Sequence, residues 1–228
     1  MNNNANKGKL IVIEGLDGSG KATQTELLCR RLEKEGFAPL RLEYPNYDSP
    51  SSALVKMYLS GELSQGADGV NPYAAASFYA VDRCADFLKY HKQEYESGAL
   101  FISDRYTTSN IIYQTTKLPE EQWSDFIDWV ADYEYNKLAV PRPDKVIYLY
   151  MSIDVSQNLL SKRYGGDDKK KDIHEADTNY LYKCQKAAVY AADKLGWQLV
   201  LCDDGENPYD IDDIADDVFD YAINFLRK

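Results

Sequence analysis

Histidine and cysteine are scarce in this sequence and widely scattered. It contains two histidines, His91 and His174, and four cysteines that form no CxxC pair. Zinc sites and disulfide frameworks need such residues at short, regular spacings. The composition therefore disfavours a structural metal site or disulfides. It predicts reduced thiols of the kind found in intracellular proteins.

Excess basic charge and long hydrophobic runs are also lacking. The formal net charge is −11 at pH 7, whereas nucleic acid or an anionic membrane selects a basic face. No run approaches the roughly 20 apolar residues of a membrane-spanning helix, and the start, MNNNANKGK, lacks the apolar core of a signal peptide. We therefore expect a cytoplasmic protein that binds neither nucleic acid nor membrane.

Short apolar runs alternate with stretches of helical periodicity along the 228 residues. The runs are KLIVIE (9–14), PLRLEY (39–44), LFISD (100–104), DKVIYLYM (144–151) and QLVLC (198–202), and helical spacing occurs at 22–35, 72–97, 120–138 and 179–195. Strands that alternate with helices pair in parallel through right-handed crossovers, which leave helices on both faces. The pattern predicts an α/β three-layer sandwich with a five-stranded parallel sheet, in a single domain (9–228) after a flexible tail (1–8). Ligands of such sheets bind beyond the carboxyl ends of the strands.

A glycine-rich loop follows the first of these strands and opens onto a helix. The segment EGLDGSGKAT, 14–23, matches the phosphate-binding pattern GxxxxGK. In such a P-loop the backbone N–H groups and the helix N-terminus surround the phosphates, and the lysine reaches the outer ones. The alternative is a turn that only caps a helix. We predict that the loop binds a nucleotide through Gly15, Leu16, Asp17, Gly18, Ser19, Gly20, Lys21, Ala22 and Thr23.

Ala22 stands where the P-loop pattern has a serine or threonine, whose hydroxyl normally takes one position on Mg²⁺. This ion keeps several waters and takes carboxylates where they are near, so a water can replace the hydroxyl. Asp17 in the loop and Asp104, at the end of the run LFISD, are the carboxylates at hand. We predict a magnesium site at these two residues.

Further motifs follow in order along the chain: YPNYDSP (44–50), FYAVDR (78–83), DRYTTSNIIYQ (104–114), PDKVIYL (143–149) and DIHEAD (172–177). Together with EGLDGSGK they resemble the thymidylate kinase family, over about residues 9–226. The resemblance implies a P-loop nucleoside monophosphate kinase that moves the γ-phosphoryl group of ATP to dTMP with Mg²⁺, for dTTP synthesis, as a homodimer. Two alternatives remain: a kinase for another deoxynucleoside monophosphate, or a non-catalytic nucleotide-binding protein, which Ala22 would permit.

The resemblance also implies roles for residues of the middle motifs. Arg105 would hold the dTMP phosphate, which suits a planar fork of donors, although a surface ion pair is the alternative. Arg83 would donate to thymine O4, and Tyr79 would stack on the ring where the family usually has Phe. Alternatively, Phe78 and Tyr79 are core aromatics on one helix.

Two further groups complete the implied acceptor site. Asn110 would contact the base, Gln114 could form a hydrogen bond with it, and Tyr113 would exclude a 2′-hydroxyl. If 105–116 is helical, Asn110 and Tyr113 lie on one face with Arg105 or Ser109. Pro45 and Tyr47 resemble the loop beside the acceptor phosphate, although many relatives have an arginine near Asn46. With Asp17 and Glu175, the implied substrate contacts are Pro45, Tyr47, Tyr79, Arg83, Arg105, Asn110, Tyr113 and Gln114.

One cation is missing from the loop, because Gly18 stands where one branch of the family has an arginine. We expect a lid at about 161–175 to supply it, through Arg163 and secondarily through one of Lys169, Lys170 and Lys171, although a charge run is often only a solvated loop. Glu175 resembles a family acid near the magnesium or the sugar 3′-hydroxyl. The implied catalytic residues are then Lys21, Asp17, Asp104, Arg105 and Arg163.

Overall fold

A five-stranded parallel sheet forms the centre of the computed structural model, which describes residues 7–64, 69–163 and 178–228. The strands lie in the order β2-β3-β1-β4-β5, with all neighbouring pairs parallel. Their bounds are Lys9–Gly15 (β1), Pro39–Glu43 (β2), Leu100–Asp104 (β3), Lys145–Tyr150 (β4) and Gln198–Leu201 (β5). The predicted sheet is confirmed, and each strand differs from its predicted bounds by at most one residue at an end.

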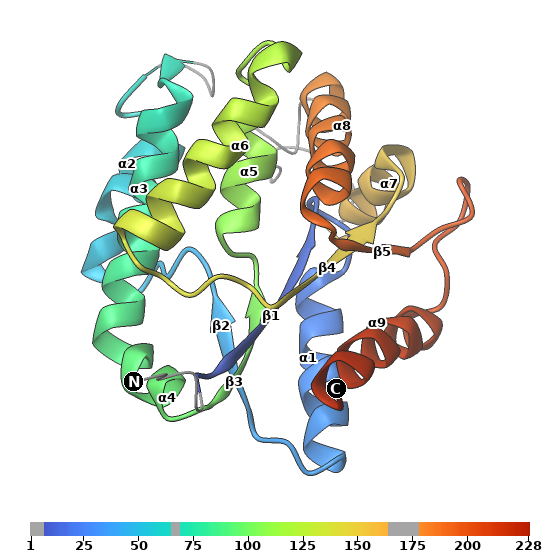
Figure 1. The fold of residues 1–228 in the computed structure, drawn as a ribbon. Coiled ribbons are helices and arrows are strands. Elements are labelled where there is room, and N and C mark those ends of the chain that lie inside the picture. Colours follow the sequence, from blue (N-terminus) through green and yellow to red (C-terminus); the bar gives the residue numbers. More distant parts are fainter. Residues whose placement is uncertain (1–6, 65–68, 164–177) are drawn as a thin grey trace.

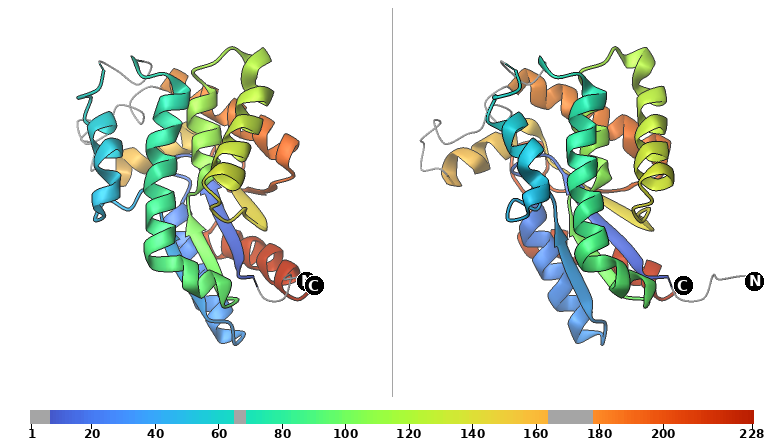
Figure 2. Two further views of the ribbon diagram at one scale, coloured as in Figure 1. Left: turned by 60° about the vertical axis from the view of Figure 1, so that its left-hand side comes forward. Right: turned by 90° about the vertical axis from the view of Figure 1, so that its left-hand side faces the viewer.

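Helices cover both faces of the sheet, as predicted (Figures 1 and 2). On one face pack α3 (Pro72–Asp86), α5 (Thr107–Thr115), α6 (Trp123–Ala131) and α8 (Thr178–Leu195). On the other face pack α1 (Lys21–Lys34) and α9 (Ile211–Leu226). Alternation along β1 divides the two cores, since Leu10 and Val12 face the first group while Ile11 and Ile13 face the second.

Two of the predicted helical stretches contain a turn of π-helix. The stretch predicted at 72–97 is α3, then the π-helical η3 (Phe87–His91), then α4 (Lys92–Glu96). The stretch predicted at 120–138 is η4 (Glu120–Gln122), α6 and the π-helical η5 (Asp132–Lys137). Such turns widen the helix locally and often occur at functional sites.

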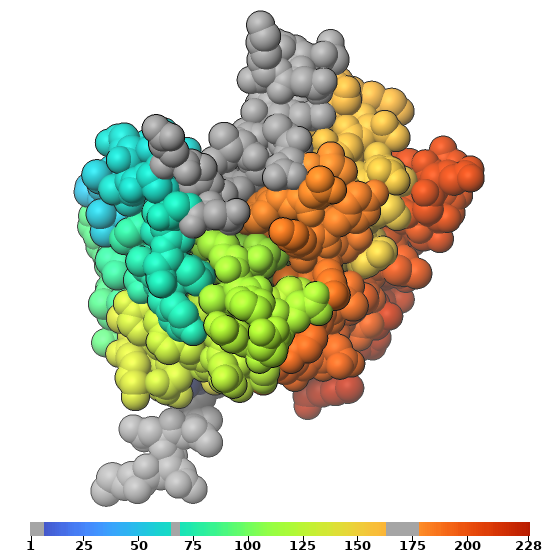
Figure 3. Space-filling model, turned by 90° about the horizontal axis from the view of Figure 1, so that it is seen from above, coloured from blue at the N-terminus to red at the C-terminus, as the bar shows by residue number. Residues whose placement is uncertain are grey.

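The remaining helices lie near the carboxyl ends of the strands. The short η1 (Pro50–Ser52) leads into α2 (Ala53–Leu59), which packs on α3, and α7 (Ile153–Arg163) follows β4. Figure 3 shows this end of the molecule, with α2 and α3 to one side and α7 and α8 to the other. Among the described helices, none is both long enough and apolar enough to span a lipid bilayer.

Strand register brings the candidate residues to this same edge. Ile13 of β1 lies opposite Asp104 of β3, and Gly15 lies opposite Leu149 of β4. The loop after β1 and the residues after β3 are therefore neighbours, although about 90 residues separate them in the chain.

Candidate active site

The glycine-rich loop has a conformation that few other residues could adopt. Gly18 and Gly20 have φ angles of 82° and 86°. A Cβ at Gly18 would lie 2.9 Å from the carbonyl oxygen of Ser156 in α7, so this backbone leaves no room for a side chain at this position. Gly20 is the N-cap of α1, no side chain caps the helix, and its first turn holds no acidic residue. The N-terminus of α1 is therefore open to an anion.

Lys21 is held inside the loop rather than in solvent. Its side chain is 8% exposed, Nζ donates to the Leu16 carbonyl oxygen at 2.9 Å, and Nζ lies 3.8 Å from Asp17 Oδ1. Burial and the nearby Arg105 guanidinium lower the pKa of Lys21, against the carboxylates that raise it. An anion that entered the loop would relieve this crowding of positive charge.

A cavity opens directly above the loop, which we call the loop pocket. It is lined by Asp17, Gly18, Gly20, Lys21, Ala22, Thr23, Glu43, Tyr44, Asp104, Arg105, Leu159 and Leu160. Six of the nine predicted loop residues line it. The other three, Gly15, Leu16 and Ser19, are buried beneath, where a Cβ on Gly15 would meet the Ser19 hydroxyl at 2.4 Å.

A second cavity, the inner pocket, adjoins the first. It is lined by Asp17, Tyr44, Pro45, Tyr47, Leu59, Tyr79, Asp82, Arg83, Arg105, Tyr106, Ser109, Asn110, Tyr113, Gln114 and Tyr180. All the predicted substrate contacts in the described part of the chain line this pocket. Glu175 and the lid lysines lie outside the described residues, as does the side chain of Arg163, whose backbone ends α7. Asp17, Tyr44 and Arg105 line both pockets.

Arg105 reaches this junction through an unusual backbone. The condition that 105–116 is helical holds only for Thr107–Thr115, so Arg105, which has a φ of 63°, lies between β3 and α5. Its Nη2 forms an ion pair with Asp17, and its Nη1 donates to the Tyr113 hydroxyl at 3.3 Å. The left-handed backbone of Arg105, in the turn between β3 and α5, thus brings its side chain to Tyr113, and helical spacing does not.

The carboxylate of Asp17 is fixed from both sides. Besides the Arg105 ion pair, its Oδ2 accepts from the Tyr113 hydroxyl at 3.2 Å. Burial alone would raise the pKa of Asp17, but Arg105 and Lys21 lower it to about 2. Asp17 is therefore ionised at neutral pH and ties Arg105 to the loop.

Arg83 is buried, with 3% of its side chain exposed, at the far side of the inner pocket. Its Nε and Nη2 donate to the two carboxylate oxygens of Glu134 at 2.7 and 3.3 Å. Glu134 Oε1 also accepts from Asn110 Nδ2 at 2.9 Å. Burial alone would lower the pKa of Arg83, but Glu134 raises it. The sequence reasoning missed Glu134, which lies in the helical stretch before PDKVIYL and belongs to none of the motifs.

Glu14 is the other carboxylate that the sequence reasoning missed. It is fully buried, and its Oε2 accepts from the hydroxyls of Thr108 and Ser109 at 2.6 and 2.8 Å. Its Oε1 lies 4.0 Å from Arg105 Nη1. Glu14 directly precedes the first glycine of the loop, near the carboxyl end of β1. This position was the only feature of the sequence that could have pointed to it.

The segment after β2 lines the inner pocket with Pro45 and Tyr47 but turns Asn46 away from it. The Asn46 N–H donates to Asp82 Oδ2 at 3.1 Å, and its Nδ2 donates to Asp86 Oδ1 at 2.7 Å. Asn46 therefore anchors the segment to α3.

The loop pocket also offers oxygen ligands for a cation. Asp104 is 6% exposed and lines the pocket, and no residue of the described chain forms a hydrogen bond or ion pair with its carboxylate. Within the described ranges, no group of three or more His, Cys, Asp and Glu residues could hold a metal by itself. The carboxylate oxygens present therefore fit a hard ion such as Mg²⁺, which completes its coordination with waters and phosphate oxygens. They do not fit a metal that is held by protein ligands alone.

Comparison with known proteins agrees with this geometry. The family model for thymidylate kinase matches residues 13–208. The chain belongs to the thymidylate kinase family. It is 34% identical over 160 residues to a probable thymidylate kinase of Thermococcus gammatolerans, which covers 68% of this chain and 72% of the relative. It is 30% identical over 184 residues to a thymidylate kinase of Mycobacterium tuberculosis, with 80% and 84% covered.

The fold agrees as well. The solved thymidylate kinase of Candida albicans superposes with a TM-score of 0.69 at 21% sequence identity, covering 96% of this chain and 92% of that one. As a thymidylate kinase family member, this protein is an enzyme that phosphorylates dTMP.

Proposed function

We propose that this protein transfers the γ-phosphoryl group of ATP directly to dTMP, with ATP in the loop pocket and dTMP in the inner pocket. The observation that carries this proposal is the shared wall of the two pockets, at Asp17, Tyr44 and Arg105. Phosphoryl transfer requires that the donor and acceptor lie in line, with positive charge around the moving group. Arg105 stands where the two substrates would meet.

On the donor side, the loop supplies N–H groups and one cation. The uncapped N-terminus of α1 would receive phosphate oxygens, together with the backbone of the loop from Gly15 to Thr23. Lys21 Nζ would leave the Leu16 carbonyl for the outer phosphates. The lowered pKa of Lys21 then rises again as the phosphates restore an anionic environment.

Magnesium would be held on the same side by Asp104, with Asp17 and Glu175 as further candidates. The ion supplies charge neutralisation to the phosphate oxygens. Because Ala22 brings no hydroxyl, a water would take that coordination position. Asp104 is the stronger candidate, since Asp17 is already engaged by Arg105 and Tyr113.

On the acceptor side, Arg105 would hold the dTMP phosphate and Tyr113 would pack against the deoxyribose. Tyr79 would stack on the thymine ring, with Pro45 and Tyr47 beside the phosphate. Arg83, Asn110 and Gln114 would bind the edge of the base. Gln114 Oε1 is buried and accepts no hydrogen bond from the described residues, which supports a role in binding a ligand.

We also propose a cytoplasmic homodimer. Exposed apolar side chains of α2 and the α3–η3 helix support a docking surface for a second copy: Leu54, Met57, Val81 and Leu88, which are 36–56% exposed. In a two-fold dimer the same surface of each chain faces its partner. None of the four cysteines, all of which lie in the described ranges, forms a disulfide, which agrees with a reducing compartment.

A coupled assay of ADP release tests the proposed substrates. The purified protein with ATP and Mg²⁺ would be offered dTMP, dUMP, dCMP, dGMP and AMP separately. The proposal predicts that dTMP gives the highest kcat/KM. A higher kcat/KM for another monophosphate would assign a different acceptor, and ATP binding without turnover on any of them would indicate a non-catalytic protein.

A further inference from the structure

Glu134 is a buried carboxylate that none of the sequence motifs contains. Only 1% of its side chain is exposed, yet it contacts two different residues of the inner pocket, Arg83 and Asn110. Resting on the proposed function of that pocket, we propose that Glu134 is a positioning residue that fixes the hydrogen-bond polarity of the base site. Through it the pocket accepts thymine and rejects cytosine.

The first step concerns Arg83. Glu134 accepts from Nε and Nη2, and the guanidinium lies 5.4 and 5.1 Å from the ring centroids of Tyr44 and Tyr106. Within the described chain, no residue accepts from Nη1, while the side chain lines the inner pocket. A guanidinium has no acceptor atom, so the edge that remains can only donate.

The second step concerns Asn110. Its Nδ2 donates to the Ala76 carbonyl oxygen at 3.0 Å and to Glu134 Oε1 at 2.9 Å, which uses both amide hydrogens. These two acceptors determine which end of the amide is nitrogen. Oδ1 is left, and none of the described residues donates to it. Asn110 therefore presents an acceptor to the pocket.

Together the two residues form a donor beside an acceptor, and thymine has the opposite pattern. Its O4 accepts and its N3–H donates, so O4 fits Arg83 and N3–H fits Asn110 Oδ1. Cytosine carries an amino group at position 4 and an unprotonated N3, so both contacts would become donor against donor or acceptor against acceptor. A site built in this way rejects the wrong partner strongly, because buried polar groups remain unpaired.

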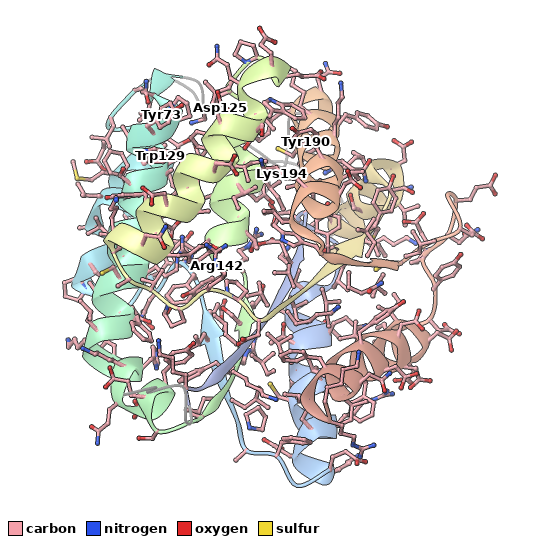
Figure 4. All side chains as sticks on the ribbon, in the orientation of Figure 1. Tyr73, Asp125, Trp129, Arg142, Tyr190 and Lys194 are labelled. Carbon is pink, nitrogen blue, oxygen red and sulfur yellow. The ribbon has the colours of Figure 1, made fainter. Side chains whose placement is uncertain are left out.

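The fold holds Glu134 at the point where it reaches both partners. Arg83 is on α3, Asn110 is on α5, and Glu134 is on η5, which extends α6. Tyr73 of α3 and Trp129 of α6 meet edge to face with centroids 4.7 Å apart, and Figure 4 shows the two side chains between these helices. The three helices thus converge on one carboxylate.

Glu134→Gln tests the inference, because it keeps the shape and removes the charge. Its carbonyl can still accept from Arg83 Nε, but its amide nitrogen then faces Asn110 Nδ2, so one of the two acceptors that fix the Asn110 amide is lost and only the Ala76 carbonyl oxygen still holds it. We expect the ratio of kcat/KM for dTMP over dCMP to fall about tenfold or more, with a gain for dCMP as well as a loss for dTMP. Glu120→Gln, at an exposed ion pair with Lys186, is the matched control and should leave the ratio unchanged.

Glu134→Asp separates this role from a merely structural one. The shorter side chain keeps two acceptor oxygens and the charge, so it should raise KM for dTMP while the preference for dTMP persists. Equal losses on dTMP and dCMP in the Gln variant, with no gain for dCMP, would overturn the inference. If Glu134→Gln does not fold, the double variant Arg83→Met/Glu134→Gln leaves no unpaired buried charge, and an unchanged dTMP preference in it would equally overturn the inference.

Failure of the proposed function would be recognised separately. It would appear in the wild-type protein as no preference for dTMP over dCMP, whatever the variants do. If wild type discriminates and Glu134→Gln discriminates equally well, only the role of Glu134 is wrong.

Discussion

At the scale of single residues, the contacts between Asp17, Arg105 and Tyr113 decide how the two pockets are joined. Asp17 belongs to the loop, Arg105 follows β3, and Tyr113 lies in α5, so three separate segments meet through one ion pair and two hydrogen bonds. Burial of this group makes each partner depend on the others, because removing one leaves a desolvated polar group unpaired. Substitutions here should therefore affect binding more than folding of the sheet.

Arg105→Ala should impair the reaction mainly through dTMP. We expect kcat/KM for dTMP to fall on the order of 10²- to 10³-fold, because a cation aimed at the acceptor phosphate is lost, and KM for ATP to change less. Arg142→Ala is the control, since Arg142 is exposed in the segment between η5 and β4 (Figure 4) and its substitution should leave both constants unchanged. Equal effects of Arg105→Ala on both substrates would contradict its placement on the acceptor side.

Ala22→Ser should tighten the binding of Mg·ATP modestly. Ala22 lines the loop pocket at the start of α1, so a hydroxyl there would return the missing magnesium ligand. We expect the apparent KM for Mg·ATP to fall about two- to fivefold with little change in kcat, measured over a magnesium titration. A wild-type protein that is inactive until Ala22 becomes Ser would show that a water cannot replace the hydroxyl.

At the scale of elements, the sequence predicted regular structure well and its irregular turns poorly. The apolar run of β1 predicted a strand of the sheet, and the strand–loop–helix order around the glycines predicted the P-loop. Both features can be recognised in the sequence because burial and glycine conformation act over a few neighbouring residues. The π-turn η5, the left-handed backbone of Arg105 and the seven-residue α2 depend on contacts distant in sequence. Glu134 was missed for that reason: its partners lie 24 and 51 residues away.

The C-terminal end of α7 provides the prediction at this scale. Leu159 and Leu160 of this helix line the loop pocket, and Arg163 ends the helix three to four residues later, one turn away. Since Gly18 leaves the loop without an arginine, we expect Arg163→Ala to lower kcat on the order of 10³-fold while substrate affinities change little. Lys162→Ala, the neighbouring charge, is the control. A kcat within about twofold of wild type, which is under roughly 0.5 kcal/mol, would exclude Arg163 as the missing cation.

At the scale of the whole molecule, charge is distributed unevenly. The chain carries a net charge of −11, yet the cations Lys21, Arg83 and Arg105 gather at the two pockets. Because the carboxylates Asp17, Glu43, Asp82 and Asp104 also line these pockets, neither pocket is the extended basic face that a polyanion requires. The apolar side chains of α2 and the α3–η3 helix remain exposed in the single chain.

Introducing charge on that exposed apolar surface should separate the proposed dimer. Val81 and Leu88 are 43% and 56% exposed, so Val81→Glu/Leu88→Glu should leave the fold intact while opposing a dimer through repulsion and desolvation. We expect light scattering coupled to size-exclusion chromatography to give the mass of two chains for wild type and of one chain for the variant. Leu201→Glu, on the edge strand β5, is the control and should remain dimeric. A dimer that survives the double substitution would place the interface elsewhere.

The central claim is that one phosphoryl group passes directly between the two adjoining pockets. Incubation with [γ-³²P]ATP, Mg²⁺ and unlabelled dTMP, followed by separation of the nucleotides, tests it most directly. The account predicts that label appears in dTDP in step with ADP formation, and that both are lost together in Lys21→Ala and in Arg105→Ala. Label released as inorganic phosphate at the rate of ADP formation, with none in dTDP, would contradict the account.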